Sequence, residues 1–252
     1  MSPLKPLKAL LTSKKKPLVA AHRGASGYAP ENTVAAFNLA LKMGADAIEL
    51  DVHLSKDGVP VIIHDPRLER TTSGTGLVYD HTVQELKEFD TGSWFDPAFA
   101  VERMLTLEET LQWARGKTSL LIEIKNSPMK YKGIAEKVLT LAQKHGMTKY
   151  VEVFSFDHNL SLRIRKLSPG VLTGVCYAAD PITHAALAVR AKANLIHPNV
   201  NYCTPKAVSE AHKKGLWVAV WTVNDTEIAQ RLAELGVDII KTDFPDKIKG
   251  SL

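Results

Sequence analysis

Only two of the 252 residues are cysteines, Cys176 and Cys203, and no apolar segment is long. A chain of this length can build its own hydrophobic core, so a disulfide framework is unnecessary and two reduced thiols are expected. The apolar patch near the N-terminus, Ala9-Leu10-Leu11, falls short of the roughly 7–15 residues of a secretory signal and the about 20 of a membrane span. These absences predict an intracellular, cytoplasmic protein without a transmembrane segment.

Acidic residues are outnumbered, since 32 Lys and Arg stand against 27 Asp and Glu and give a formal charge of +5. The surplus lies at one end. Residues 1–16 hold five lysines and no acidic residue, so residues 17–252 carry 27 groups of each sign. We interpret residues 1–16 as a Lys-rich, solvated leader and residues 17–252 as one domain. Weak contact of the leader with an anionic membrane surface is the alternative, and the charge-balanced domain predicts no nucleic-acid partner.

Short β-branched segments alternate along the chain with segments of helical spacing. The candidate strands are residues 17–21, 47–52, 120–124, 151–154, 171–175, 194–196, 217–221 and 237–240. After Thr33, which suits a helix N-cap, Val34, Phe37 and Leu41 lie on one helix face, and later segments repeat this design. The alternation predicts an α/β fold, a TIM (β/α)8 barrel. An open doubly wound sheet is the alternative, but no G-x-G-x-x-G follows the first strand.

One segment interrupts the alternation after the second strand. Asp57-Gly58 lies between two apolar segments and predicts a two-residue hairpin turn, which would place His64 opposite Asp51. Residues from about 65 to 104 then follow neither spacing. Because a structureless loop of that length is uncommon, we expect a small ordered insertion subdomain over one mouth of the barrel.

Carboxylates are placed at the ends of two candidate strands, where a barrel carries its functional groups. Glu49 and Asp51 are two residues apart, as are Glu123 and Lys125, so each pair shares one face of its strand. Buried carboxylates are costly unless they are paired or bound to a metal. Oxygen ligands of this kind favour Mg²⁺, Ca²⁺ or Mn²⁺. A buried salt-bridge network with Lys125 is the structural alternative.

Seven motifs follow one another along the chain. They are Val19-Ala20-Ala21-His22-Arg23-Gly24, Pro30-Glu31-Asn32-Thr33, Ala47-Ile48-Glu49-Leu50-Asp51-Val52, Val61-Ile62-Ile63-His64-Asp65, Ile122-Glu123-Ile124-Lys125, Trp221-Thr222-Val223-Asn224 and Thr242-Asp243-Phe244-Pro245. Together and in this order they resemble the glycerophosphodiester phosphodiesterase family, over residues 18 to about 247. The charged positions of the motifs show no departure from the family, whereas the Lys-rich leader is not part of its pattern. The family's fold, a TIM barrel with a small insertion after the second strand, is the one expected above.

The resemblance implies an enzyme for a small-molecule substrate. It would hydrolyse glycerophosphodiesters, such as glycerophosphocholine or glycerophosphoethanolamine, to glycerol 3-phosphate and an alcohol. By motif position, one divalent ion, Mg²⁺ or Ca²⁺, would be held by Glu49, Asp51 and Glu123. His22 and His64 would be the general acid and base, since imidazoles titrate near neutral pH.

The remaining residues of the implied site bind substrate. Arg23 and Lys125 would hold the phosphate, one as a planar fork and the other as a point charge. Trp221 resembles the family's substrate-side aromatic, although packing in the core explains it equally well. We interpret His197 and the Glu31-Asn32 pair as structural.

Two other functions remain open on the sequence. A lysophospholipase D-type activity on lysophospholipids would use the basic leader and the apolar side chains around Trp94, Phe95 and Phe99. A non-catalytic protein that binds a phosphate ligand is the second. The sequence leaves open the metal, the head group, the nucleophile (water or the glycerol's own hydroxyl), which histidine is the acid, and the oligomeric state.

Overall fold

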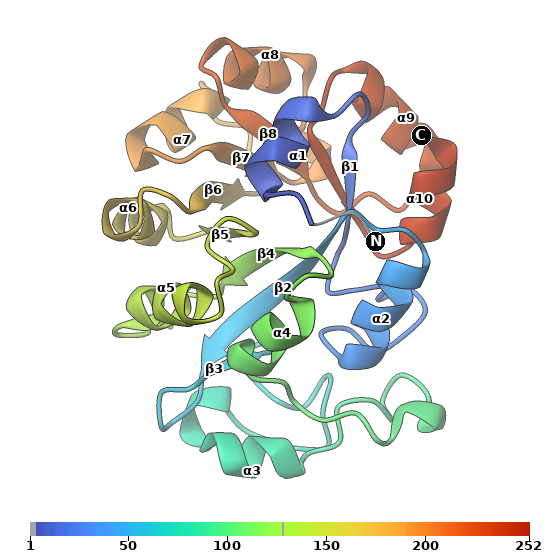
Figure 1. Ribbon diagram of the computed structural model, residues 1–252, viewed down its shortest axis with the longest axis vertical. Coiled ribbons are helices and arrows are strands. Elements are labelled where there is room, and N and C mark those ends of the chain that lie inside the picture. The colour runs from blue at the N-terminus through green and yellow to red at the C-terminus, as the bar shows by residue number, and fades with distance from the viewer. Residues whose placement is uncertain (1–3, 128) are drawn as a thin grey trace.

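Parallel pairing runs without a break through eight strands in the computed structural model, which describes residues 4–127 and 129–252 (Figure 1). The strands are β1 Leu18–Ala21, β2 Ala47–Leu54, β4 Ser119–Ile124, β5 Val151–Ser155, β6 Leu172–Tyr177, β7 Leu195–Pro198, β8 Trp217–Val220 and β9 Ile239–Thr242. β1 pairs with both β9 and β2, so the sheet closes on itself. The predicted TIM barrel is confirmed.

Helices follow the strands and cover the outside of the barrel (Figure 1). They are α2 Val34–Lys42, α4 Leu107–Ala114, α5 Ile134–Lys144, α6 His158–Leu167, α7 His184–Ala191, α8 Pro205–Lys213, α9 Thr226–Glu234 and α10 Pro245–Ser251, with a 3-10 turn η3 at Val200–Tyr202. Thr33 is the N-cap of α2 as predicted, and its hydroxyl accepts a hydrogen bond from the amide of Ala36. None of the helices in the described ranges has both the length and the apolar character needed to cross a membrane.

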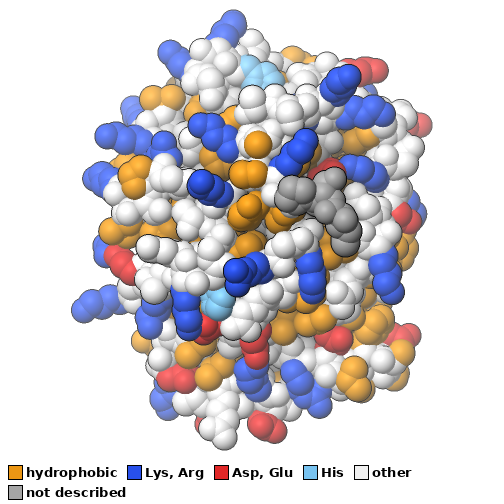
Figure 2. Space-filling view, in the orientation of Figure 1, with side chains coloured by type: hydrophobic (Ala, Val, Ile, Leu, Met, Phe, Trp, Pro, Cys, Tyr) orange, Lys and Arg blue, Asp and Glu red, His pale blue; other side chains and the backbone are white. Residues whose placement is uncertain are grey.

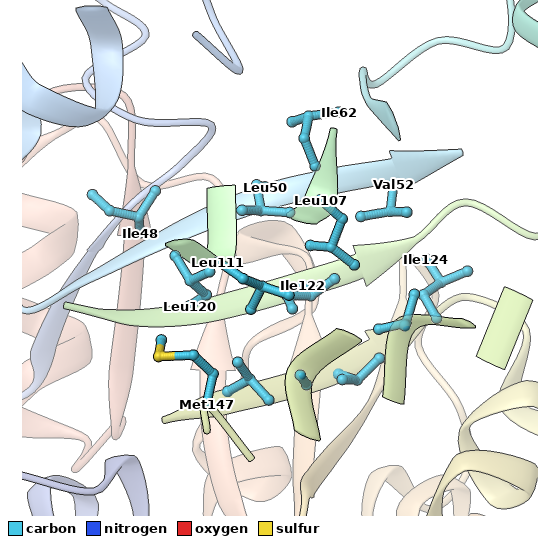
Figure 3. Packing of buried hydrophobic residues seen from close by; sticks show 14 of the residues in the cluster. Ile48, Leu50, Val52, Ile62, Leu107, Leu111, Leu120, Ile122, Ile124 and Met147 are labelled. Carbon is cyan, nitrogen blue, oxygen red and sulfur yellow. The ribbon is translucent and has the colours of Figure 1, made fainter. Parts of the chain in front are cut away.

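The two faces of β2 separate the core from the site. Ile48, Leu50 and Val52 point outward, where they pack with β4 and α4 in a buried cluster (Figure 3). The alternate residues Glu49 and Asp51 point into the barrel, because successive side chains of a strand lie on opposite faces. A single strand therefore supplies both the hydrophobic contact with the helices and two of the carboxylates inside the barrel.

The leader is not a solvated tail over residues 7–13, and that interpretation was wrong. These residues form helix α1 (Leu7–Ser13), with Leu7 and Leu11 buried against interior barrel residues at the amino-terminal ends of the strands. Lys14 pairs with Asp238 at 2.9 Å. Residues 1–3 of the predicted leader lie outside the described residues. Lys and Arg side chains are scattered over the face that α1 crosses (Figure 2).

The insertion after β2 is ordered, as expected. It contains β3 (Pro60–Ile62), α3 (Val83–Glu88) and the 3-10 turns η1 (Val78–Asp80) and η2 (Pro97–Phe99). It has a small core of its own, formed by Val61, Ile63, Leu68, Val78, Leu86 and Met104. This subdomain lies beside α4 at the lower edge of the barrel in Figure 1.

The hairpin between β2 and β3 has a different register from the predicted one. Val52 pairs with Ile62 and Leu54 with Pro60, so Ile63, and not His64, lies opposite Asp51. The turn is longer than two residues, because the amide of Ser55 already bonds to the carbonyl of Val59 at 3.0 Å. The shift by one residue places His64 just beyond the paired strand.

Candidate active site

Three carboxylates converge inside the barrel near the carboxyl ends of β2 and β4. Glu49, Asp51 and Glu123 each offer an oxygen, and these oxygens lie within 4.8 Å of one another. These residues are only 1%, 1% and 6% exposed. Asp51 and Glu123 are direct neighbours in the register of β2 and β4. The predicted set is therefore brought together by strand pairing.

Two cations lie against this set. The Nζ atom of Lys125 is 3.0 Å from Asp51 Oδ1 and 2.6 Å from Glu123 Oε1, and Nε of Arg23 is 3.2 Å from Asp51 Oδ2. Burial alone would raise the pKa of Asp51, but Lys125 and Arg23 outweigh it and hold that pKa well below its ordinary value. Burial raises the pKa of Glu123 despite the Lys125 charge.

A third cation was missed from the sequence. Lys241, on β9, is buried with Nζ 4.0 Å from Glu49 Oε1 and 3.8 Å from the ring centroid of Phe154. A lysine within a strand next to apolar residues carries no special signal, and only closure of the barrel brings it beside Glu49. Three cationic side chains, and not the two indicated by the sequence, therefore lie against the three carboxylates.

The donor set fits a hard divalent cation. Asp51 Oδ1 and Glu123 Oε1 are buried and make no hydrogen bond of good geometry within the described residues, although Lys125 is close to both. Three clustered carboxylates of this kind offer the all-oxygen ligands that Mg²⁺ and Ca²⁺ prefer. Glu49, Asp51 and Glu123 are therefore the residues that would hold such an ion.

The loop after β1 orients these carboxylates. Arg23 has a left-handed backbone (φ 57°), and its amide donates to Glu49 Oε2 at 3.0 Å. The side-chain amide of Asn32 donates to Asp51 Oδ2 at 3.0 Å, while Glu31 accepts from Nη1 of Arg23 at 3.0 Å. A Cβ on Gly24 would lie 2.7 Å from the Cβ of Ala36, so only glycine allows α2 to approach this loop. Glu31 thus positions the guanidinium of Arg23, and Asn32 positions the carboxylate of Asp51.

Two histidines stand at the rim, and each is held by an aspartate. His22 Nδ1 lies 2.7 Å from Asp243 Oδ1, and His64 Nδ1 lies 2.6 Å from Asp65 Oδ1. Each contact fixes one ring nitrogen and leaves Nε2 for another partner. Burial alone would raise the pKa of both aspartates. Hydrogen bonds from Arg70 and His64 outweigh it at Asp65, and the contact with His22 does so at Asp243, so the pKa of each aspartate is lowered to about 2. Neither aspartate had been assigned a role from the sequence, although both lie in the quoted motifs.

His64 has charged neighbours on several sides. Burial lowers its pKa below the ordinary value, the carboxylate of Asp51 opposes this, and Lys125 and Arg23 reinforce it. Its carbonyl oxygen lies 3.0 Å from Nε2 of His53, a buried residue that also contacts the hydroxyl of Tyr131 at 2.7 Å. The net effect of burial and the two cations is a lowered pKa for the His64 imidazole, which favours its neutral form.

An aromatic corner lies at the ends of β5 and β8. The rings of Phe156 and Trp221 meet edge to face with centroids 5.6 Å apart, and Phe156 is 42% exposed. The indole nitrogen of Trp221 donates to the carbonyl of His197 at 3.0 Å. His197 itself is buried, with Nε2 2.7 Å from Glu152 Oε1, which agrees with a structural role. Trp221 is partly packed in the core, so substrate contact stays a prediction for it.

The fold and the site together define a class. A TIM barrel carries its active site at the carboxyl ends of the strands, and here a buried acidic centre and two histidine–aspartate pairs occupy that end. The protein is a TIM-barrel enzyme with a cluster of carboxylates and two histidines at its active end.

Comparison with known proteins gives the family. Residues 22–247 match the glycerophosphoryl diester phosphodiesterase family. The chain is 43% identical over 233 residues to the Bacillus subtilis protein YhdW, covering 91% of this chain and 96% of that protein. It is 39% identical to the glycerophosphodiester phosphodiesterase of Caldanaerobacter subterraneus subsp. tengcongensis, covering 92% and 96%.

A solved structure agrees. An Oleispira antarctica phosphodiesterase in complex with its product sn-glycerol-3-phosphate superposes with a TM-score of 0.84 at 31% identity, over 94% of this chain and 96% of that chain. The protein belongs to the glycerophosphoryl diester phosphodiesterase family and is a glycerophosphodiester phosphodiesterase. The alternative of a non-catalytic binding protein is thereby wrong.

Proposed function

We propose that the enzyme hydrolyses water-soluble glycerophosphodiesters, with glycerophosphocholine and glycerophosphoethanolamine as examples, to glycerol 3-phosphate and an alcohol in a reaction that depends on one divalent ion, Mg²⁺ or Ca²⁺. Glu49, Asp51 and Glu123 would hold that ion. When bound, it would supply positive charge to the phosphate oxygens and so ease nucleophilic attack on an anionic diester.

Arg23 and Lys125 bind the phosphate in this proposal. The guanidinium of Arg23 uses Nη1 for Glu31 and Nε for Asp51, and Nη2 has no partner among the described residues. Lys125 is 14% exposed at its side chain, so it is buried enough to keep its charge poorly solvated and open enough to meet a ligand. Burial is outweighed by Asp51 and Glu123, which raise its pKa above the ordinary value, so it carries a positive charge at all physiological pH values.

His22 and His64 move the protons. The attacking hydroxyl must lose a proton and the departing alkoxide must gain one, and a neutral and a protonated imidazole can do both. We assign the base to His64, because burial lowers its pKa and keeps Nε2 available to accept a proton. The acid is then His22, whose ring Asp243 holds by Nδ1 and whose Nε2 is left to donate a proton.

The observation that carries this proposal is the pair of aspartate-held imidazoles beside a buried carboxylate trio. The experiment measures glycerol 3-phosphate released from glycerophosphocholine with Mg²⁺, with Ca²⁺, and after chelation by EDTA. We expect release only with a divalent ion, and loss of release in His22→Ala and His64→Ala with metal binding by calorimetry retained. Turnover in EDTA-treated, metal-free enzyme, or normal turnover in either variant, would refute it.

A second substrate class is favoured by one observation. Trp94, Phe95 and Val101 of the insertion are 41%, 37% and 80% exposed, and the rings of Trp94 and Phe95 meet edge to face, so they offer apolar surface that would suit the acyl chain of a lysophospholipid. Comparing kcat/KM for lysophosphatidylcholine and glycerophosphocholine separates the two activities. A preference for the lipid that is lost in Trp94→Ser would establish the lysophospholipase D-type reaction.

We also propose that the enzyme works in the cytoplasm, since Cys176 and Cys203 are unpaired and the former is buried. Weak contact of the leader with an anionic membrane surface stays a prediction. Of its lysines, Lys8 is exposed on α1, whereas Lys14 and Lys16 bond within the chain.

A further inference from the structure

One arginine of the insertion joins two segments of the site. Nε of Arg70 donates to Asp65 Oδ2 at 2.5 Å, while Nη1 and Nη2 donate to the two oxygens of Glu31 at 2.8 Å each. Glu31 lies in the loop after β1 and Asp65 follows β3, so the two carboxylates that this guanidinium bridges lie 34 positions apart in the sequence. Neither the motifs nor the proposed reaction assigns Arg70 a role.

Each of these carboxylates is already engaged with a group of the site. Asp65 Oδ1 lies 2.6 Å from Nδ1 of His64, and Glu31 Oε1 accepts from Nη1 of Arg23 at 3.0 Å. A continuous chain of charged contacts therefore runs from His64 through Asp65, Arg70 and Glu31 to Arg23. Arg70 is the link at which the insertion meets both the histidine and the arginine.

The contact differs from an ordinary surface ion pair. Exposed pairs contribute little to stability, because their attraction acts in a high dielectric and two mobile side chains must be held in one geometry. Arg70 is 43% exposed, but Glu31 and Asp65 are only 11% and 28% exposed at their side chains, and the contact with Glu31 is bidentate. Its backbone is also fixed, since Leu68 is buried and accepts from the amide and hydroxyl of Thr72. A bidentate contact of this kind fixes the orientation of the two side chains in addition to pairing their charges.

We propose that Arg70 is a positioning residue, which holds Asp65 and Glu31 and through them sets the orientation of the His64 imidazole and the Arg23 guanidinium; this rests on the roles proposed for those two residues. Arg70 does not touch the reacting atoms. Its loss leaves the fold of the barrel intact but lets the two groups drift, and a misplacement of about 1 Å can cost roughly 100-fold in rate.

The test compares Arg70→Ala with the wild type in the glycerophosphocholine assay. We expect kcat to fall about 10- to 100-fold, and part of it to return when guanidinium chloride is added at low millimolar concentration, because the half-exposed position can admit the small cation. Sodium chloride at the same ionic strength gives no recovery. The matched control is Arg67→Ala in the same segment, whose side chain pairs, among the described residues, only with the exposed Glu69. It should stay within twofold of the wild type with no response to guanidinium.

A double variant keeps the proposal falsifiable if Arg70→Ala is less stable. Because Arg70 acts on His64 through Asp65, Asp65→Asn and Arg70→Ala should be non-additive, so that the double variant loses less than the product of the two single losses. Wild-type turnover in Arg70→Ala, full additivity, or equal recovery with sodium chloride would overturn the positioning role. His64→Ala in the same assay separates the outcomes, since normal turnover there would instead refute the proposed acid–base chemistry.

Discussion

The imidazole of His22 meets the carboxylate of Asp243 across the seam where the barrel closes, with Nδ1 2.7 Å from Oδ1. The two residues follow β1 and β9, which pair directly, and the amide of His22 donates to the carbonyl of Thr242 at 2.8 Å. The hydroxyl of Ser26 and the side-chain amide of Asn224 each donate to one oxygen of Asp243. The carboxylate is thus fixed from two sides, and it fixes the ring of His22 in turn.

Replacing Asp243 by asparagine tests this contact. Asp243→Asn keeps the shape of the side chain but removes the charge that stabilises the imidazolium, so we expect kcat to fall by at least about 100-fold, within the range for general acid–base groups. Steady-state kinetics on glycerophosphocholine measure it. Asp246→Asn is the matched control, since within residues 4–127 and 129–252 that carboxylate bonds only to the exposed hydroxyl of Tyr28. Full activity in Asp243→Asn would show that His22 needs no carboxylate partner.

The pH dependence of kcat/KM tests the base. If neutral His64 accepts the proton, activity is lost as the pH falls through its pKa. Burial, aided by Lys125 and Arg23 and opposed by Asp51 and Asp65, puts that pKa below 6.5, so the acid limb of the profile should lie below pH 6.5. Asp65→Asn removes a contact that raises the pKa and should move the limb to still lower pH. A limb above pH 6.5 in the wild type would contradict the assignment.

Removing one carboxylate of the trio tests metal binding directly. Glu123→Gln preserves the side chain's size but loses its charge, and we expect the affinity for Mg²⁺ or Ca²⁺ to fall by about 100-fold or more, because even outer partners of a metal site are worth about 10- to 100-fold. Calorimetric titration measures the affinity without turnover. Glu152→Gln is the control, a buried glutamate of the same barrel that bonds to His197. Unchanged affinity in Glu123→Gln would favour the salt-bridge network with Lys125.

Helix α1 gives a prediction about stability. Leu11 is 2% exposed and packs against interior barrel residues, so Leu11→Ala should lower the free energy of unfolding by about 2–5 kcal/mol. Thr12→Ala, on the exposed face of the same helix, should change it by less than about 0.5 kcal/mol. Chemical denaturation of both variants measures the difference. Equal stability of the two would mean that α1 does not close the barrel in solution.

The shared faces of the site residues on β2 and β4 have a local cause. In a strand, the alternation of side chains is fixed by backbone geometry, so Glu49 and Asp51 had to share a face, as did Glu123 and Lys125. The predicted register of the hairpin was wrong by one residue, because the length of a turn sets the register of its strands. The Ser55–Val59 hydrogen bond closes a turn that is longer than Asp57-Gly58 alone indicated. The prediction of a solvated leader was wrong because lysines dominate residues 1–16. Leu7 and Leu11, the two residues by which α1 is buried, are too few to give a helical hydrophobic pattern.

Periodicity and strand-end placement are local properties of a sequence. They were therefore enough to predict the order of strands and helices, the barrel class and the chemistry-bearing residues at the strand ends. Pairings across the barrel were decided only by the tertiary structure. Lys241 beside Glu49, Asp243 on His22 and Arg70 between Glu31 and Asp65 join segments far apart in the chain. Which side chains meet there depends on strand register and on closure of β1 against β9, and neither is encoded in any single segment.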